Sequence, residues 1–228
     1  ALNLSLTGIP YWNSDIGGFF SANKFPEGVK DPAFHELYVR WMQFATFTGM
    51  MRSHGTNTPR EIFMFGERGY WAFDAQEKMI NLRYRLLPYI YSTSWKITSE
   101  GESLMRALFS DFPEDKEVLD LGDEYLFGKS ILVASVTSET RSRSLYLPAG
   151  TRWIDFWTGE VQDGGCEITR ETPVDIIPLY VKAGSIIPVG PTVQFATEKS
   201  WDDLQLRIYP GANGEFTLYE DEDDNYNY

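Results

Sequence analysis

The stretch "GIPYWNSDIGGFF", residues 8–20, combines features that neither a buried strand nor a surface turn needs together. An apolar, aromatic run leads to a carboxylate at Asp15, and two glycines then precede Phe19. A strand that ends at the floor of a polar pocket accounts for all of these, because glycine lets the backbone turn sharply beside a ligand. We therefore interpret residues 2–12 as a buried strand whose end presents Asp15 to a pocket.

A second stretch repeats this pattern. Residues 47–55, "FTGMMRSHG", are again short, apolar and closed by polar groups. Between the two stretches, residues 31–47 predict a helix with Asp31 as a good N-cap, followed directly by proline. A long amphipathic helix is predicted from about Asp74, with a kink at Pro88. The order strand–helix–strand–helix predicts parallel strands joined by crossover helices.

The polar residues at the two strand ends form the candidate site. In (β/α)8 barrels the active site lies at the carboxyl ends of the strands, so Asp15 and His54 are expected to point into one pocket. There they could bind sugar hydroxyls through charge-assisted hydrogen bonds. Arg52 could hold Asp15 or a neighbouring acid in its ionised state, and Phe19 could form an apolar wall. The alternative is an aspartate that caps a turn and a histidine that is satisfied inside the fold.

The sequence changes character after about Gly101. Short β-rich runs follow, separated by Gly, Pro and Asp at the spacing of a sandwich or barrel. The fold class is thus α/β plus all-β, and we predict domains at residues 1–101, 102–192 and 193–228. A partial parallel barrel leaves an open strand edge, so the first domain should be stabilised by packing on the second.

Composition narrows the classes of ligand. The 228 residues include 43% hydrophobic and 15% aromatic residues, enough for a sizeable core. The net charge of −13 argues against nucleic acid and anionic membranes as partners and leaves neutral ligands such as sugars. The single cysteine, Cys166, excludes an intrachain disulfide and a cysteine-cluster metal site. No apolar run has the length of a transmembrane span, no targeting signal indicates a compartment, and the missing initiator methionine suggests a start inside a longer protein.

Ordered blocks along the chain resemble glycoside hydrolase family 31. They are "GIPYWNSDIGGF", "MMRSHGTNTPREIFMFGE", "NLRYRLLPYIYS", "MRALFSDFPED", "LFGKSILVASV", "YLPAGTRWIDFWTGE", "IPLYVKAGSIIPVGP" and "LYEDEDDNYNY". They occur in the family's order and cover nearly the whole chain, which is far more specific than any single motif. The first two blocks and the last resemble the α-xylosidase branch more than the lysosomal or fungal α-glucosidases.

The resemblance implies a retaining α-glycosidase on a (β/α)8 TIM barrel, followed by antiparallel β-sandwich domains, with no metal and no cofactor. Asp15 matches the family's aspartate after the seventh strand, which binds sugar hydroxyls in subsite −1. Phe19 matches the aromatic residue that follows it. His54 matches the subsite −1 histidine after the eighth strand, and Arg52 matches the arginine before it, which orders the pocket. The implied substrate is an oligosaccharide with terminal α-linked xylose or glucose.

The resemblance also predicts what the chain lacks. Retaining hydrolysis needs two carboxyl groups about 5–5.5 Å apart. In this family both are aspartates on earlier barrel strands, and neither of their motifs is present here; the "GD" at Asp123 falls in the β-rich part. We therefore expect the last two βα units of the barrel and the sandwich, without a catalytic residue and inactive alone. Such a piece should associate with the remainder of the parent enzyme or with a second copy.

Alternatives remain at this point. Within the family they are an α-glucosidase, a transglycosylase or an α-glucan lyase; in another class, the isolated chain is a sugar-binding or structural module. Trp12 and Phe65 could line the pocket mouth or belong to the core. Trp153 is expected in the core of the sandwich, with an exposed sugar platform as the alternative. His35, between a phenylalanine and a glutamate on the predicted helix, is expected to face solvent.

Overall fold

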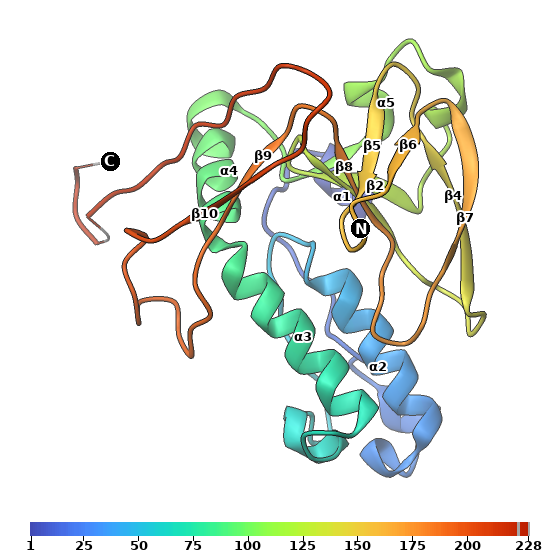
Figure 1. Cartoon of the computed structure of the whole chain (residues 1–228). Helices are drawn as coiled ribbons and strands as arrows, with labels where there is room; N and C mark the ends of the chain where they lie inside the picture. Colours follow the sequence, from blue (N-terminus) through green and yellow to red (C-terminus); the bar gives the residue numbers. More distant parts are fainter. Residues whose placement is uncertain (223, 228) are drawn as a thin grey trace.

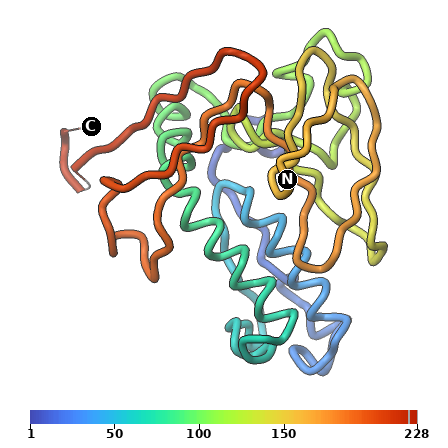
Figure 2. Tube along the Cα trace, viewed as in Figure 1, coloured from blue at the N-terminus to red at the C-terminus, as the bar shows by residue number. Residues whose placement is uncertain are grey.

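The computed structural model describes residues 1–222 and 224–227. Figure 1 shows two parts of different character: helices that run from the bottom centre to the upper left, and a group of strands at the upper right. We call residues 1–101 the helical half and residues 102–192 the sheet half. The polypeptide leaves the sheet half and crosses back over the helices near its carboxyl end, as the trace in Figure 2 shows.

The helices of the helical half do not all begin at a cap or proline predicted from the sequence. They are α1 (Leu2–Leu6), α2 (Pro32–Ala45), α3 (Trp71–Arg85) and α4 (Leu87–Glu100), with 3-10 turns at Ser21–Asn23, Gly28–Lys30 and Ile62–Phe65. The Asp31 carboxylate accepts a hydrogen bond from the Ala33 N–H at 2.9 Å, as expected of an N-cap. Pro88 lies in the first turn of α4, so the predicted kink is a division into two helices. The first of these starts at Trp71, slightly before the predicted position.

The predicted strand over residues 2–12 is wrong at its beginning. Leu2–Leu6 is helical, and its buried residues are Leu2 and Ser5, which share one face of a helix at i, i+3. The leucines alternate as they would in a strand, but Leu4 is exposed. Their alternation therefore does not reflect a buried sheet face.

The two stretches expected to be barrel strands are extended but form no ladder. Two backbone hydrogen bonds of 3.2 Å join them, from the Met50 N–H to the Trp12 carbonyl and from the Ile16 N–H to the Arg52 carbonyl. Both stretches run in the same direction, because the higher residue number on one is paired with the higher number on the other. Among the described residues, no strand is formed before Met105. The two stretches thus keep a parallel course but are not paired strands, so the predicted last two βα units of a barrel are not confirmed.

The sheet half contains most of the strands. They are β1 (Met105–Ala107), β2 (Glu124–Phe127), β3 (Ile131–Ala134), β4 (Ser142–Leu147), β5 (Arg152–Asp155), β6 (Val161–Asp163), β7 (Cys166–Glu171), β8 (Leu179–Lys182), β9 (Ile186–Val189) and β10 (Gln205–Ile208), with α5 (Leu108–Asp111) and a 3-10 turn at Lys116–Val118. One sheet has the order β1-β2-β3-β8-β5-β6, β4 pairs with β7, and β10 pairs with β9. Every pairing is antiparallel, which confirms the predicted antiparallel character of this part.

The large sheet is buried on both faces. Side chains alternate along a strand, so Tyr125 and Phe127 face the helical half while Leu126, between them, faces the β4–β7 pair. The same alternation places Trp153 in the second cluster, where it is completely buried. Trp153 is therefore a core residue and not an exposed sugar platform.

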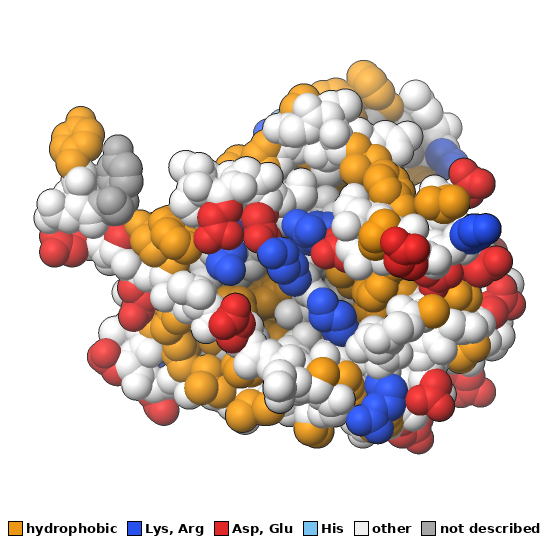
Figure 3. Space-filling view, turned by 90° about the horizontal axis from the view of Figure 1, so that it is seen from above, with side chains coloured by type: hydrophobic (Ala, Val, Ile, Leu, Met, Phe, Trp, Pro, Cys, Tyr) orange, Lys and Arg blue, Asp and Glu red, His pale blue; other side chains and the backbone are white. Residues whose placement is uncertain are grey.

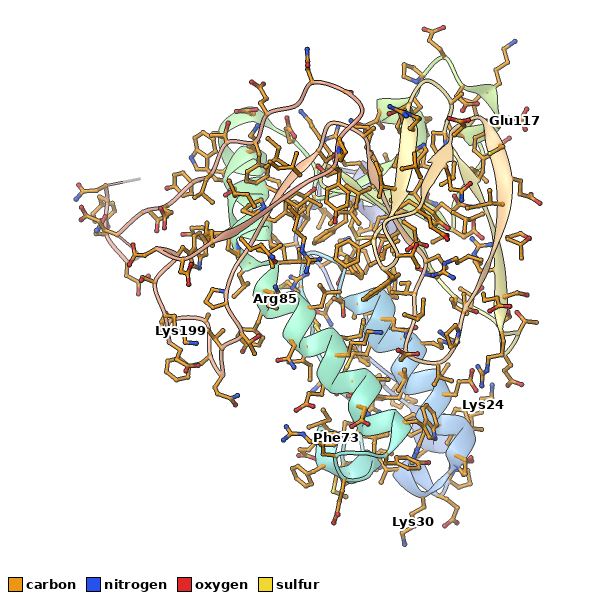
Figure 4. The ribbon with its side chains drawn as sticks, viewed as in Figure 1. Lys24, Lys30, Phe73, Arg85, Glu117 and Lys199 are labelled. Atoms are coloured by element: carbon orange, nitrogen blue, oxygen red, sulfur yellow. The ribbon has the colours of Figure 1, made fainter. Side chains whose placement is uncertain are left out.

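Hydrogen bonds between side chains and backbone connect the two halves. The buried Tyr125 hydroxyl donates to the Phe47 carbonyl at 2.9 Å, and the Tyr89 hydroxyl donates to the Phe127 carbonyl at 2.8 Å. Arg85, labelled in Figure 4, donates to the Gly190 carbonyl at 3.4 Å. Since apolar clusters and hydrogen bonds both cross the boundary, the helical half is packed on the sheet half.

Residues 193–222 and 224–227 follow the sheet half and include β10, which pairs with β9. The Tyr219 ring stacks on Trp95 of α4 with their centroids 5.0 Å apart. Residues 223 and 228 of the predicted third domain lie outside the described residues. On the face in Figure 3, acidic and basic side chains are intermixed, with the basic ones gathered near the middle. Among the described residues, no helix is both long and apolar enough to cross a membrane.

Candidate functional site

The candidate site lies where the two extended stretches end. Both run toward the lower ends of α2 and α3 in Figure 1, away from the sheet half, and each is followed there by a loop. We call residues 15–21 the first loop and residues 52–60 the second loop. The Thr56 N–H donates to the Phe19 carbonyl at 3.0 Å, so the two loops are in direct contact. The parallel course therefore brings the ends of both stretches to one place.

Asp15 and Arg52 form an ion pair across the two loops. The distance from the arginine Nη2 to Asp15 Oδ1 is 3.3 Å, and the same carboxylate oxygen accepts from Asn13 Nδ2 at 3.3 Å. The Arg52 side chain is 55% exposed and the Asp15 side chain 21% exposed. The arginine thus lies on the solvent side of the pair.

The backbone turns immediately after Asp15. The Gly18 N–H donates to the Asp15 carbonyl at 2.8 Å, and Gly17 and Gly18 have φ angles of +83° and +81°. Residues other than glycine rarely adopt these positive φ angles. A Cβ at Gly17 would also lie 2.7 Å from the Tyr38 ring of α2. Both glycines in the opening stretch are therefore favoured by the backbone conformation, and Gly17 is also required by the lack of space beside Tyr38.

Phe19 and His54 form the second pair across the loops. Their ring centroids are 5.3 Å apart with an interplanar angle of 57°. His54 is exposed and lines a cavity of about 290 Å³ together with Ser53, Gly55, Thr58, Pro59, Arg60 and Glu61. The structure thus brings together all four predicted residues as two cross-loop pairs, Asp15 with Arg52 and Phe19 with His54.

Arg60 is a residue of this region that the sequence analysis did not single out. Its guanidinium donates to the carbonyls of Ile16, Gly18 and His54, and so it binds both loops. Burial lowers the pKa of Arg60 because desolvation disfavours its charged form. An arginine in a polar loop is normally exposed, so no local signal in "TNTPRE" indicated this burial.

The site offers groups suited to an uncharged polyol. A carboxylate accepts hydrogen bonds from hydroxyls, an imidazole can donate and accept, and an aromatic ring can pack against the C–H face of a sugar. Among the described residues, no group of three or more His, Cys, Asp or Glu side chains could hold a metal ion.

Three aromatic residues have structural roles. Phe65 is completely buried, and Trp12 is buried with its indole N–H donating to the Ser5 hydroxyl, so neither lines the pocket mouth. His35 was expected to face solvent, and this prediction was wrong. It is buried against Phe65 and Tyr70, and its Nε2 lies at hydrogen-bond distance from the Val29 carbonyl. The 3-10 turn Ile62–Phe65 and the start of α3 cover the face of α2 that carries His35, and the sequence pattern of α2 alone does not indicate this contact.

A second, larger cavity shares no lining residue with the cavity beside His54. A groove of about 1070 Å³ runs between α2, the amino-terminal residues and the sheet half. Leu37, Trp41 and Phe44 of α2 form one wall, and Tyr125 and Val136 of the sheet half form another. We refer to it below as the α2 groove.

Comparison with known protein families accounts for both halves of the chain. The description "Glycosyl hydrolases family 31 TIM-barrel domain" matches residues 1–93, and "Glycosyl hydrolase family 31 C-terminal domain" matches residues 101–187. The chain belongs to glycosyl hydrolase family 31. An α-xylosidase of Saccharolobus solfataricus is 44% identical over 229 aligned residues, which cover 100% of this chain and 30% of that protein.

Solved structures of the same family superpose closely. The GH31 α-xylosidase of Xanthomonas citri has a TM-score of 0.91 at 39% identity, covering 97% of this chain and 24% of its own. A GH31 dextranase of Flavobacterium johnsoniae, solved as a variant with isomaltotriose, has a TM-score of 0.87 at 37% identity, with 97% and 27% covered. This glycosyl hydrolase family 31 chain therefore spans between about a quarter and a third of the length of these relatives.

Proposed function

We propose that this chain is a sugar-binding part of a retaining α-glycosidase that removes terminal α-linked xylose from oligosaccharides. Asp15 and His54 bind hydroxyls of the sugar in subsite −1, Phe19 forms the wall beside it, and Arg52 orients Asp15. The observation that carries the proposal is the pairing of these residues across two neighbouring loops, at 3.3 Å for the ion pair and 5.3 Å for the rings. The α-xylosidase relatives support the choice of xylose.

The proposal assigns no catalytic residue to this chain. Retaining hydrolysis requires a nucleophilic carboxylate and a carboxylic acid about 5–5.5 Å apart. Asp15 is held by a guanidinium and an amide, an environment suited to accepting hydrogen bonds rather than to attack on an anomeric carbon. The nucleophile and the acid/base are then supplied by the earlier strands of the parent barrel, which the relatives' greater length can accommodate.

The α2 groove is the surface proposed to bind that remainder of the enzyme. In a closed barrel, each helix packs between two neighbouring helices, and among the described helices α2 packs most extensively on α3. Its other side carries the apolar wall of the groove, with Trp41 and Phe44 only partly buried. An unpartnered apolar groove of this size marks a protein interface. Binding of a second copy of this chain is the alternative occupant.

Binding of xylose to the 228-residue chain tests the sugar-binding role. Titration by NMR is expected to show saturable binding, and Asp15→Asn and His54→Leu should each weaken it about tenfold, the effect of one lost charge-assisted or imidazole hydrogen bond. Glu171→Gln, on the exposed edge of the sheet half, is the matched control and should leave the affinity unchanged. Equal affinity in all four proteins would contradict the site. Turnover of an aryl α-xyloside by this chain alone would contradict the absence of the catalytic pair.

Glucose is the second candidate for the bound sugar. The dextranase structure with isomaltotriose, an oligomer of glucose, favours it. Glucose differs from xylose by its hydroxymethyl group, so the two monosaccharides compared in the same titration separate an α-xylosidase from an α-glucosidase. Tighter binding of xylose supports the first assignment, and tighter binding of glucose replaces it with the second.

A further inference from the structure

Arg60, the last residue of the second loop, forms hydrogen bonds with both loops of the candidate site. Its Nη1 donates to the Ile16 carbonyl at 2.7 Å and to the His54 carbonyl at 2.8 Å. Its Nη2 donates to the Gly18 carbonyl at 2.8 Å and to the Ser21 hydroxyl at 2.9 Å. Three of these acceptors belong to the first loop and one to the second, so a single planar group spans the two.

The guanidinium suits this position because it presents several donors in one fixed plane. Four hydrogen bonds to separate acceptors in a buried setting fix the relative position of those acceptors. Arg60 is buried, and its Nε has no hydrogen-bond partner among the described residues. A lysine places its donors on one nitrogen and cannot reproduce a fork that reaches acceptors on both sides.

The guanidinium of Arg60 occupies the space that a side chain at Gly55 would need. A Cβ on Gly55 would lie 2.0 Å from Arg60 Nη2, so any larger residue there displaces the guanidinium. Tyr38 of α2 supports the same loop, since its hydroxyl donates to the Ser53 hydroxyl at 2.7 Å and lies 3.2 Å from the Arg60 carbonyl. The second loop is therefore held both at the residue before His54 and at His54 itself.

We propose that Arg60 is a positioning residue of the sugar site, which sets the distance between the Asp15–Phe19 loop and the His54 loop. It acts through the backbone carbonyls and does not touch the sugar. The inference rests on the proposed function for its effect on sugar binding, but its effect on loop geometry stands apart from it. Small displacements of binding groups weaken recognition strongly, so loss of this link should be measurable.

The test compares Arg60→Lys with Arg40→Lys in the full 228-residue chain. Arg40 is a matched control, because it is also a buried arginine that donates to three backbone carbonyls, those of Thr172, Pro173 and Ile176. It holds a loop of the sheet half and makes none of the contacts of the two site loops. Xylose affinity, the nuclear Overhauser effect between the Phe19 and His54 rings, and the melting temperature are measured for both variants.

Arg60→Lys is expected to weaken xylose binding about tenfold and to diminish the Phe19–His54 effect. Arg40→Lys should lower the melting temperature to a similar degree and leave both other readouts unchanged. Gly55→Ala keeps Arg60 but places a methyl group where its guanidinium lies. This variant should weaken xylose binding and diminish the Phe19–His54 effect in the same way, and it replaces Arg60→Lys if that variant does not fold. An undiminished ring effect in these site variants, or an equal loss of affinity in Arg40→Lys, would overturn the proposal. If the unaltered chain binds no xylose, the proposed function fails. The nuclear Overhauser effect between the Phe19 and His54 rings then still decides whether Arg60 positions the two loops.

Discussion

The helical half and the sheet half satisfy their backbone hydrogen bonds in different ways. In the sheet half, strands pair with strands, and the six-stranded sheet carries an unbroken antiparallel order. In the helical half, two extended stretches share only two backbone hydrogen bonds. Arginines bind several other carbonyls in and beside these stretches: Arg83 donates to those of Thr46, Thr48 and Gly49 at 2.8, 2.7 and 3.0 Å.

The comparison shows that in the helical half a few buried side chains donate the hydrogen bonds that neighbouring strands would otherwise supply. Buried carbonyls must find donors, and where strands are missing the donors come from elsewhere in the chain. Arg60 and Arg83 supply them in the helical half, and the Tyr125 hydroxyl supplies another to Phe47. Stability there is concentrated in single residues, whereas in the sheet half it is spread over many equivalent bonds.

The largest effect is expected from Arg83→Met. The substitution keeps an apolar stem but leaves three buried carbonyls without donors, which should lower the free energy of unfolding by about 4 kcal/mol. Burial lowers the pKa of Arg83 to about 10, which shows how far this group is removed from water. Urea denaturation measures the loss, and hydrogen exchange should show faster opening of residues 46–52 than of β2 and β3.

The control for this experiment is Arg68→Met. Arg68 pairs with Glu77 at the surface, where its side chain is 76% exposed, and its removal should leave the free energy of unfolding nearly unchanged. If both arginine variants lose the same stability, or if β2 opens together with residues 46–52, the helical half does not depend on single carbonyl-binding side chains.

An intermediate effect is expected from Glu124, the buried carboxyl group of β2. Desolvation by burial raises its pKa from 4.5 to about 7, and its oxygens accept from the Tyr146 N–H at 3.0 and 3.2 Å. The folded state therefore holds the proton more tightly than the unfolded state. Its contribution is fully present below pH 4.5 and is lost as pH rises to about 7, a fall of about 3 kcal/mol.

Glu124→Gln keeps an acceptor for the Tyr146 N–H and removes the titration. The variant should lose less stability than the unaltered chain between pH 4.5 and 7, as chemical denaturation at several pH values will show. Glu171→Gln, at an exposed position of β7, should leave the pH profile unchanged. A profile for Glu124→Gln that coincides with the unaltered one would show that this carboxyl does not make the sheet half pH-sensitive.

The smallest effect is expected at the candidate site itself. The coupling between Asp15 and Arg52 should be below about 1 kcal/mol in a double-mutant cycle of Asp15→Asn and Arg52→Gln, since the arginine is largely in solvent. Added salt should reduce it further. A coupling of several kcal/mol would indicate that this pair, and not Arg60, holds the loops together.

Local rules predicted the elements that short-range interactions define. Asp31 as an N-cap, the break at Pro88 and the antiparallel runs of the sheet half all follow from caps, a missing N–H and turn residues, and all are present. The helix Leu2–Leu6 was missed because five residues are too few to separate a period of 2 from one of 3.6. His35 was misplaced because a neighbouring loop, not its own helix, covers it.

By itself, the sequence determined the family, the three longer helices and the antiparallel half, and it proposed the four residues of the candidate site, because each depends on residue types in a fixed local order. Only the tertiary structure decided that Asp15 pairs with Arg52 and Phe19 with His54, and that Arg60 lies buried beneath them. Those contacts join residues about 35–45 positions apart, so they depend on how two loops meet in space. No periodicity or cap along the chain encodes that meeting, which arises when the helices pack and bring both loops to one end.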